Sequence, residues 1–369
     1  MTVHANSSLS GVKPYKQGRS EISGRKRVVK LSSNELPYPP SPAAIQAFRE
    51  TEQNLNRYPD GSQAALRKAV ASIHGVPQRN IFAGNGSDEA IALLIRSVLS
   101  ASDSMVTSEN SFLMAEIYAR SVGARVEKCR EFYHRVDVDA ILEAASETAR
   151  IVYICSPNNT SGTYTTDEEL RKLDRLLHPE TLMIVDAAYA EFADASDYGN
   201  GMRLFEPDGR VAVTRTFSKA YGLAAQRIGW ALAPDSVVDA VSRVRSPFNT
   251  NTAALNAAVA AVQDQDYLKR TVSRIKYTRD YFSSRLRDLE LNVIPSQANF
   301  VLVSFPHGGN QAVSLDAWLQ ENGILGRPVE GDANEFRISI GTEDEMELAF
   351  EAIREWVGSR NGAGRRNLG

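Results

Sequence analysis

Short apolar runs that alternate with helical patterns constrain the fold more than any other feature of this sequence. The runs occupy residues 81–83, 104–107, 150–156, 181–186, 211–217 and 228–233. They are continuously apolar rather than alternating with polar residues, which is typical of strands that are covered on both faces. Strands separated by helices favour a mainly parallel sheet with right-handed crossovers. In such sheets, ligands bind outside the carboxyl ends of the strands.

The length and the later pattern divide the chain into two domains. A chain of 369 residues is too long for one minimal domain, so a large and a smaller domain are expected. We predict a large domain over residues 41–255, which begins with a helix capped by Ser41, and a small α/β domain over residues 256–369. The polar segment 1–40 would form an arm and part of the small domain. The tail from residue 358 would be disordered.

The composition narrows the class of protein. A hydrophobic content of 43% and a charged content of 24% are those of an ordinary globular protein, and the net charge of −3 argues against nucleic acid as the main partner. Cys129 and Cys155 are far apart and lack a metal-binding spacing, which suits a reduced compartment. The sequence shows no signal peptide and no membrane-spanning run, so we expect a soluble cytoplasmic protein without a metal site.

Two polar turns follow predicted strands. In AGNGSDEAI, Gly86, Ser87 and Asp88 stand where a helix begins. A helix N-terminus binds anions such as phosphate, but Asp88 in the first turn also fits ordinary capping. In CSPNNTSG, Asn159 follows the end of a strand, where it either faces a ligand or belongs to an Asn-rich turn.

Asp186 ends a strongly apolar strand in MIVDAAYAEF, and Tyr189 follows three residues later. A buried carboxylate needs a cationic partner or several hydrogen bonds, so Asp186 has either a structural or a catalytic role. Phe112 in ENSFLMAEIYA is either a core residue or an aromatic surface for a planar ligand. Both alternatives stay open on these residues alone.

Lys219 comes directly after a predicted strand in TRTFSKAYGLAAQRIGW, with Arg227 eight residues later. Most lysines near a helix start extend along the surface with their charge in solvent. Here, however, a Gly-rich turn, an Asn turn, a strand-end aspartate and a Ser-Lys pair all fall at strand ends of one predicted sheet. They occur in the order that a pyridoxal-phosphate site requires.

The chain resembles the fold-type I pyridoxal-phosphate-dependent aminotransferases and, among them, the histidinol-phosphate aminotransferase family. The resemblance runs almost from end to end through the blocks KPYKQGR, KLSSNELPYPPSP, RYPDGSQAALRKAVA, GNGSDEAI, CSPNN, DAAYAEF, TRTFSKAYGLAAQRIGW, PFNTN, SQANFVLV and EFRISIGTEDE. The Ser-Lys block with its arginine and the RISIGT block are specific in combination. The resemblance implies an α/β fold, in which a large domain with a mainly parallel central sheet flanked by helices adjoins a smaller α/β domain.

The resemblance also implies a cofactor site with Lys219, Asp186 and Tyr189 as catalytic residues. Lys219 would bind pyridoxal 5'-phosphate covalently and move the proton of the substrate Cα, and Asp186 would pair with the ring nitrogen. Asn159 and Tyr189 would hydrogen-bond to the phenolic oxygen of the cofactor, and Phe112 would stack on its ring. The cofactor phosphate would be held by Gly86, Ser87, Asp88, Thr216, Ser218, Arg227 and, from a neighbouring subunit, Tyr58.

Substrate binding would involve both subunits of a homodimer. Arg337 in FRISIGT would bind the anionic end of a small-molecule amino donor or 2-oxo acid, with Arg327 as a second anion contact and Asn159 beside it. Tyr15 would reach the substrate across the subunit interface.

The sequence departs from the family pattern near the site. Thr160 and Ser161 replace the usual Pro-Thr, which removes a residue that favours a rigid turn beside Asn159. Ala187 stands where an acid is common. Phe112 stands where the histidinol-phosphate enzymes often have Tyr, which removes a hydroxyl and keeps the stacking surface. These changes bear on substrate choice rather than on the core chemistry.

The implied function is transamination of histidinol phosphate and 2-oxoglutarate to imidazole acetol phosphate and L-glutamate, in histidine biosynthesis. An aromatic amino-acid aminotransferase, or a paralogue in a specialised pathway, would keep this site and change the side-chain pocket. A phospho-amino-acid decarboxylase of the same fold would keep the lysine and release carbon dioxide. A non-catalytic binding module is disfavoured because Lys219, Asp186 and Arg227 are all present.

Overall fold

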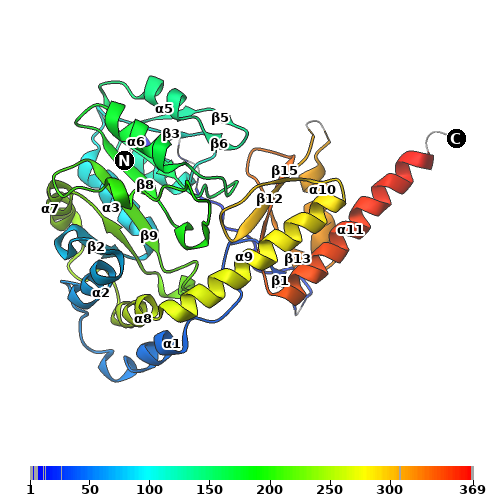
Figure 1. The fold of residues 1–369 in the computed structure, drawn as a ribbon, viewed down its shortest axis with the longest axis horizontal. Helices are drawn as coiled ribbons and strands as arrows, with labels where there is room; N and C mark the ends of the chain where they lie inside the picture. Colours follow the sequence, from blue (N-terminus) through cyan, green and yellow to red (C-terminus); the bar gives the residue numbers. More distant parts are fainter. Residues whose placement is uncertain are drawn as a thin grey trace.

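Two α/β domains lie side by side in the computed structural model, which describes residues 3, 7–10, 12, 14–25, 27–306 and 309–366 (Figure 1). The large domain is built on a seven-stranded sheet, and the small domain on a four-stranded sheet. This arrangement confirms the two-domain α/β fold expected from the sequence.

The large sheet brings the ends of its central strands together. From one edge to the other its strands are β2 (Ile81–Gly84), β10 (Gly229–Leu232), β9 (Val211–Thr216), β8 (Leu182–Asp186), β7 (Ala149–Cys155), β3 (Ser104–Ser108) and β4 (Arg125–Cys129). Strand β10 is antiparallel to both neighbours, and the other pairings are parallel. The carboxyl ends of β7, β8 and β9 therefore lie side by side at one end of these strands, where ligands of such sheets bind.

Helices cover both faces of this sheet. Alternate side chains of β7 belong to different apolar clusters, with Tyr153 on one face and Val152 on the other. The first face is covered by α3 (Gly86–Val98), α4 (Leu113–Ser121) and α7 (Asp235–Val244). The second face is covered by α1 (Pro42–Arg49), α2 (Ala64–His74), α5 (Val138–Ala144), α6 (Asp167–Leu176) and α8 (Thr252–Gln263).

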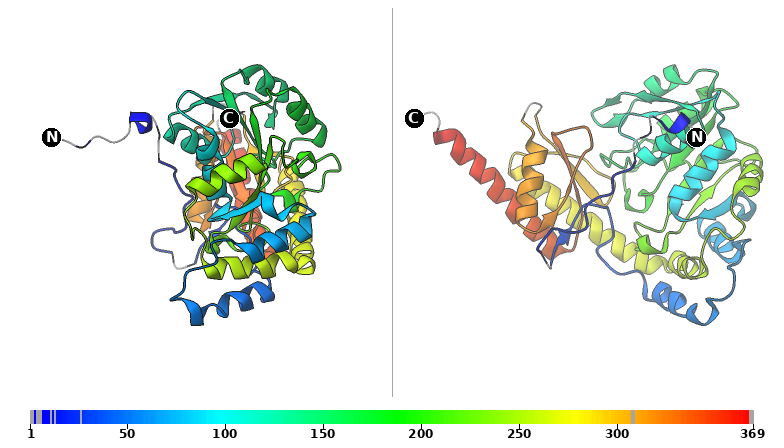
Figure 2. Two further views of the ribbon diagram at one scale, coloured as in Figure 1. Left: turned by 90° about the vertical axis from the view of Figure 1, so that its left-hand side faces the viewer. Right: turned by 180° about the vertical axis from the view of Figure 1, so that it is seen from behind.

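The division between the domains falls along a long helix. Ser41 caps α1 through its side chain, which accepts a hydrogen bond from the backbone N–H of Ala44, and Pro42 opens the helix as the sequence predicts. Helix α8 packs against α1 and α2, so the large domain extends beyond residue 255. Helix α9 (Gln265–Asp288) then runs from the large domain to the small one (Figures 1 and 2).

The small domain carries one part of the N-terminal arm. Its sheet has the order β11 (Asn292–Ile294), β12 (Phe300–Ser304), β15 (Glu335–Ser339) and β14 (Arg327–Pro328), next to α10 (Gln311–Glu321). Strand β1 (Val29–Lys30) of the arm pairs in parallel with β13 (Ile324–Leu325). A hairpin of β5 (Glu131–Phe132) and β6 (Arg135–Val136) belongs to the large domain.

The C-terminal helix is longer than the sequence pattern indicates. Helix α11 (Glu343–Arg366) continues to Arg366, so the described backbone is helical over most of the segment for which a disordered tail is expected. Residues 367–369 lie outside the described part of the chain. Among the described residues, no helix is both long and apolar enough to cross a membrane.

A buried ion pair links strand β9 to the loop after β8. The guanidinium Nη2 of Arg215 lies 2.7 Å from Oε1 of Glu191, and both side chains are almost fully buried. Removing one partner of such a pair leaves the other charge buried without compensation, which is more costly than replacing both.

We therefore expect Glu191→Ala to lower the free energy of unfolding by about 3 kcal/mol or more. The double variant Glu191→Leu/Arg215→Met should lose much less, since no charge is left alone. Urea unfolding of the cofactor-free proteins measures both values. A single variant as stable as the wild type would contradict the argument.

Candidate active site

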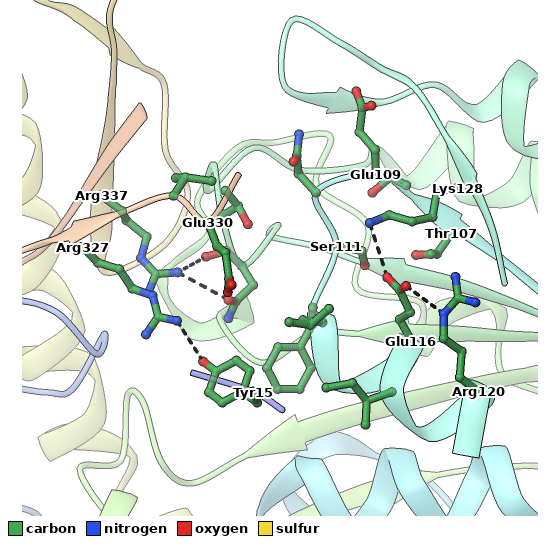
Figure 3. Close-up of a pocket in the computed structure, with 18 of the residues that line it drawn as sticks. Tyr15, Thr107, Glu109, Ser111, Glu116, Arg120, Lys128, Arg327, Glu330 and Arg337 are labelled. Atoms are coloured by element: carbon green, nitrogen blue, oxygen red, sulfur yellow. Dashed lines mark hydrogen bonds and ion pairs between the residues drawn. The ribbon is translucent and has the colours of Figure 1, made fainter. Parts of the chain in front are cut away.

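Two adjoining cavities of about 560 and 310 Å³ lie where the large domain faces the small one. Both are lined by Tyr15, Phe112, Asn159, Arg327 and Arg337. Figure 3 shows Tyr15, Arg327 and Arg337 on one side of the larger cavity. The smaller cavity is also lined by Tyr189, which follows β8, and by Lys219, which follows β9, whereas Asp186 is not among the residues that line these two cavities.

Lys219 extends into the smaller cavity from the loop after β9. Its Nζ donates a hydrogen bond to the carbonyl oxygen of Ser33 at 3.3 Å and lies 5.6 Å from the ring centre of Tyr189. Burial and, next, the nearby positive charge of Arg337 lower the pKa of Lys219 to about 8. The amine is therefore partly neutral near physiological pH, unlike an ordinary surface lysine.

Asp186 ends β8 as a buried carboxylate held by neutral donors. The hydroxyl of Tyr153 donates to Oδ2 at 2.7 Å, and the hydroxyl of Thr214 donates to Oδ1 at 2.8 Å. These two residues belong to the strands on either side of β8, namely β7 and β9. Burial raises the pKa of Asp186 above its ordinary value, while both hydrogen bonds lower it. A positive group brought against this carboxylate would favour its ionised form.

Tyr189 and Asn159 meet beside Lys219. The side-chain amide of Asn159 donates to the hydroxyl of the fully buried Tyr189 at 2.7 Å. The preceding residue, Asn158, forms an Asx turn in which its Oδ1 accepts the backbone N–H groups of Thr160 and Ser161. The turn that lacks the usual proline is thus held by asparagine, and Asn159 faces the site.

Ser218 and Arg227 of the Ser-Lys block lie at the N-terminus of α3, and we call this group of residues the anion pocket because the phosphate is predicted to bind there. Gly86 has φ +80°, and a Cβ there would lie 2.7 Å from Nη2 of Arg227, so glycine lets the guanidinium approach the helix. Nη1 of Arg227 donates to Oγ of Ser218 at 3.2 Å. The side chain of the N-cap residue, Asn85, forms no capping hydrogen bond, so it leaves the first-turn N–H groups to another acceptor.

The other predicted phosphate-binding residues include Thr216, Ser87 and Asp88. The hydroxyl oxygen of Thr216 accepts the backbone N–H of Ser218 at 3.1 Å, and both residues are buried. Ser87 and Asp88 lie in the first turn of α3. Burial raises the pKa of Asp88, and its Oδ1 atom has no hydrogen-bond partner in the described part of the chain.

The substrate-side residues come from the small domain and the arm. Nη1 of Arg337 donates to the backbone oxygen of Asn159 at 2.7 Å, which ties β15 to the large domain. Nη2 of Arg327 donates to the backbone oxygen of Lys16 at 2.9 Å and lies 3.5 Å from the hydroxyl of Tyr15. Tyr15 thus lies in the cavity of its own chain. The expectation that Tyr15 reaches a substrate across the subunit interface stays a prediction.

Tyr58 lies away from these cavities. It is 82% exposed and stacks on the ring of Phe248, with 4.7 Å between the ring centres. Phe112, by contrast, lines both cavities directly before α4.

Sequence reasoning missed several residues of the site. Asn34 donates to the Tyr189 hydroxyl at 3.0 Å, and Tyr153 and Thr214 hold Asp186. Asn34 lies in the quoted block KLSSNELPYPPSP, but that block carries no local sign of this contact. The far side of the larger cavity has a charged cluster (Figure 3), in which Glu116 pairs with Arg120 at 2.9 Å and with Lys128 at 3.3 Å.

The described residues include no cluster of three or more His, Cys, Asp or Glu side chains arranged to hold a metal ion. Cys129 and Cys155 are both free and buried. The site instead combines a partly neutral amine, a buried carboxylate, an aromatic side chain and an anion pocket.

Comparisons with known proteins agree with this geometry. Residues 26–353 match the family model of aminotransferase class I and II. A histidinol-phosphate aminotransferase of Maricaulis maris is 41% identical over 360 residues, which cover 97% of this chain and 99% of that protein. A histidinol-phosphate aminotransferase of Rhodospirillum centenum is 39% identical over 95% of this chain and 98% of its own length.

Solved structures show the same fold. The histidinol-phosphate aminotransferase of Sinorhizobium meliloti, solved in complex with pyridoxal-5'-phosphate, superposes with a TM-score of 0.85 at 30% identity, over 91% of this chain and 92% of that chain. A Thermus thermophilus aspartate aminotransferase shares the fold at 20% identity, with a TM-score of 0.77 over 89% of this chain and 91% of that one. The family model and these relatives show that the chain belongs to the aminotransferase class I and II family, which is consistent with its cavity and strand-end residues.

Proposed function

We propose that this protein is a pyridoxal-phosphate-dependent aminotransferase that converts histidinol phosphate and 2-oxoglutarate to imidazole acetol phosphate and L-glutamate, in histidine biosynthesis. The observation that carries the proposal is the position of Lys219 in the smaller cavity, where its amine lies 5.6 Å from the centre of the Tyr189 ring and has a pKa lowered to about 8. The support for the substrate is that relatives about 40% identical over nearly their whole length are histidinol-phosphate aminotransferases.

The chain's own residues fit pyridoxal phosphate. Asp186 is a buried carboxylate whose hydrogen-bond partners, Tyr153 and Thr214, are neutral, which suits a cationic ring nitrogen. The N-terminus of α3, with Ser218 and Arg227, suits a phosphate group, since a guanidinium and helix N–H groups both bind phosphate oxygens. When bound there, the cofactor supplies an electron sink for the electron pair at the substrate Cα.

Lys219 and Asp186 would have different roles in the reaction. Lys219 would hold the cofactor and, as a free amine, would move a proton between the substrate Cα and the cofactor. Its lowered pKa suits this proton transfer, because a group that titrates near the working pH both accepts and donates protons. Asp186 stabilises positive charge at the ring nitrogen through a fixed electrostatic interaction.

The small domain would orient the substrate. The guanidinium groups of Arg337 and Arg327 both line the cavity, where they would bind the anionic end of the substrate. Phe112 would pack on the planar groups in the cavity. The charged cluster of Glu116, Arg120 and Lys128 would limit the far side of the side-chain pocket.

We also propose that the protein acts as a homodimer with shared sites. Tyr58 and Leu55 are both more than 80% exposed, and Tyr58 takes no part in the cavities of its own chain. Tyr58 also stacks on the exposed ring of Phe248, and exposed apolar side chains that gather in one patch are typical of a surface that a second subunit covers.

The protonation of Lys219 can be tested without the cofactor. In the cofactor-free protein, the acylation rate at Lys219 should rise with pH through a midpoint near 8, because the neutral amine is the nucleophile. Arg337→Met should move this midpoint upward, since it removes a charge that disfavours the ammonium form. Mass spectrometry of the labelled peptide measures the rate. A midpoint at the ordinary lysine value of about 10.4 would contradict the assignment.

The substrate can be tested by half-reactions of the cofactor-loaded enzyme. Histidinol phosphate and glutamate should each discharge the visible absorbance of the bound cofactor, and Lys219→Ala should slow the reaction by about a thousandfold or more. Phenylalanine and tyrosine should react far more slowly. A faster reaction with phenylalanine would favour an aromatic aminotransferase, and release of carbon dioxide would favour a decarboxylase.

Mixed dimers test the shared site. When Lys219→Ala and Tyr58→Ala chains are unfolded together and refolded, the hybrid has one site with both Lys219 and a Tyr58 from the partner. We therefore expect the mixture to regain up to about a quarter of wild-type activity, the share expected if chains pair at random. If Tyr58 acts within its own chain, the mixture should show no gain over the separate variants.

A further inference from the structure

The hydroxyl group of Tyr189 accepts hydrogen bonds from two side-chain amides. Nδ2 of Asn159 lies at 2.7 Å and Nδ2 of Asn34 at 3.0 Å, and Tyr189 is fully buried. A phenolic oxygen has two lone pairs and one proton. With both lone pairs engaged, the proton of Tyr189 is left for a third acceptor.

The orientation of the Asn34 amide follows from its other contacts. The backbone N–H of Asn34 donates to Oγ of Ser339 at 2.8 Å, so the Ser339 hydroxyl directs its own proton elsewhere. That proton goes to Oδ1 of Asn34 at 3.0 Å. In this arrangement Oδ1 of Asn34 faces Ser339, and its NH₂ group faces Tyr189.

Arg337 orients the Asn159 amide in the same way. Nη1 of Arg337 lies 3.4 Å from Oδ1 of Asn159, while it donates to the backbone oxygen of that residue. An arginine offers donors only, so Oδ1 of Asn159 faces the guanidinium and the NH₂ group faces Tyr189. Both amides are thus oriented by residues of one strand, β15 of the small domain.

The backbone also holds Asn34 in place. Its φ is +52°, a left-handed conformation that asparagine tolerates better than most residues. Nδ2 of the buried Asn299 donates to the carbonyl oxygen of Asn34 at 3.1 Å. Asn34 is only 1% exposed, so its amide does not exchange these partners for water.

We propose that Asn34 is a positioning residue that directs the Tyr189 proton toward the phenolic oxygen of the bound cofactor, and that Ser339 sets the orientation of Asn34. This inference rests on the proposed function. It links the ring oxygen of the cofactor to β15, the strand that also carries the substrate-binding Arg337.

The surrounding charges leave Tyr189 able to donate. Burial raises the pKa of Tyr189, and the positive charge of Arg337 opposes this rise in part. The Asn34 hydrogen bond also opposes it, while Cys155 and Asp186 add to it. Tyr189 therefore keeps its proton at physiological pH.

The test compares Asn34→Asp and Asn34→Ala with the wild type. In Asn34→Asp one carboxylate oxygen can still accept from Ser339, and the other is an acceptor in place of the NH₂ donor, which turns the Tyr189 proton away from the cofactor. The measured quantity is the pH midpoint of the absorbance change of the bound cofactor. Loss of a donor to the phenolic oxygen disfavours its ionised form and raises this midpoint.

We expect the midpoint to rise by about one pH unit in Asn34→Ala and by more in Asn34→Asp. Cofactor binding to the cofactor-free protein should weaken by about tenfold in both. Ser339→Ala should cause a smaller rise in the same direction, and it gives an independent reading if the Asn34 variants fold poorly. Thermal unfolding of the cofactor-free proteins shows which variants fold.

Asn80→Ala is the matched control. Asn80 is also a fully buried asparagine, and its Nδ2 donates to the carbonyl oxygen of Ala233, at the opposite end of β10 from the anion pocket. This control should lose stability without a change in the midpoint. If the folded Asn34 and Ser339 variants have the same midpoint as the wild type, the inference is overturned, but the proposed function is not. A wild-type protein that binds no cofactor would instead overturn the proposed function.

Discussion

The burial of Asp186 at the end of β8 is the constraint on which the rest of the site depends. A carboxylate removed from water requires compensation, and here it comes from the neutral hydroxyls of Tyr153 and Thr214. Neutral donors offset the lost hydration only in part, so a positive group placed against this carboxylate would be stabilised. The two donors lie on the strands that flank β8, so the pairing of three parallel strands sets the position of this charge.

Most of the large sheet was predictable because its strands are buried on both faces and therefore read as apolar runs. Strand β4 (Arg125–Cys129) escaped this reasoning, because it is an edge strand with largely exposed or half-buried polar side chains. The direction of β10 also could not be read from its apolar run. It is antiparallel to β9, and the segment between them, which carries Lys219, forms no crossover α-helix.

Site residues that directly follow a predicted strand could be inferred from the sequence. Residues that reach the site through contacts with distant parts of the chain could not. Lys219 and Asp186 follow apolar runs directly, so their place in the fold could be inferred. Asn34 contacts residues 155 and 305 positions away along the chain, and no local pattern reports such contacts. Arg327 contacts Tyr15 and Lys16 of the arm, and the residues of the arm alone do not indicate these contacts.

The two domains contribute different kinds of residues to one cavity. The residues suited to binding the cofactor lie at strand ends of the large domain. Tyr15 comes from the arm, and Arg327 and Arg337 come from the small domain. Residues of both domains line the larger cavity, so new preferences for amines can arise by substitutions on either side of it, while the groups suited to the cofactor stay the same. Helix α9 runs from one domain to the other, so such variants would keep the same connection between the two sides.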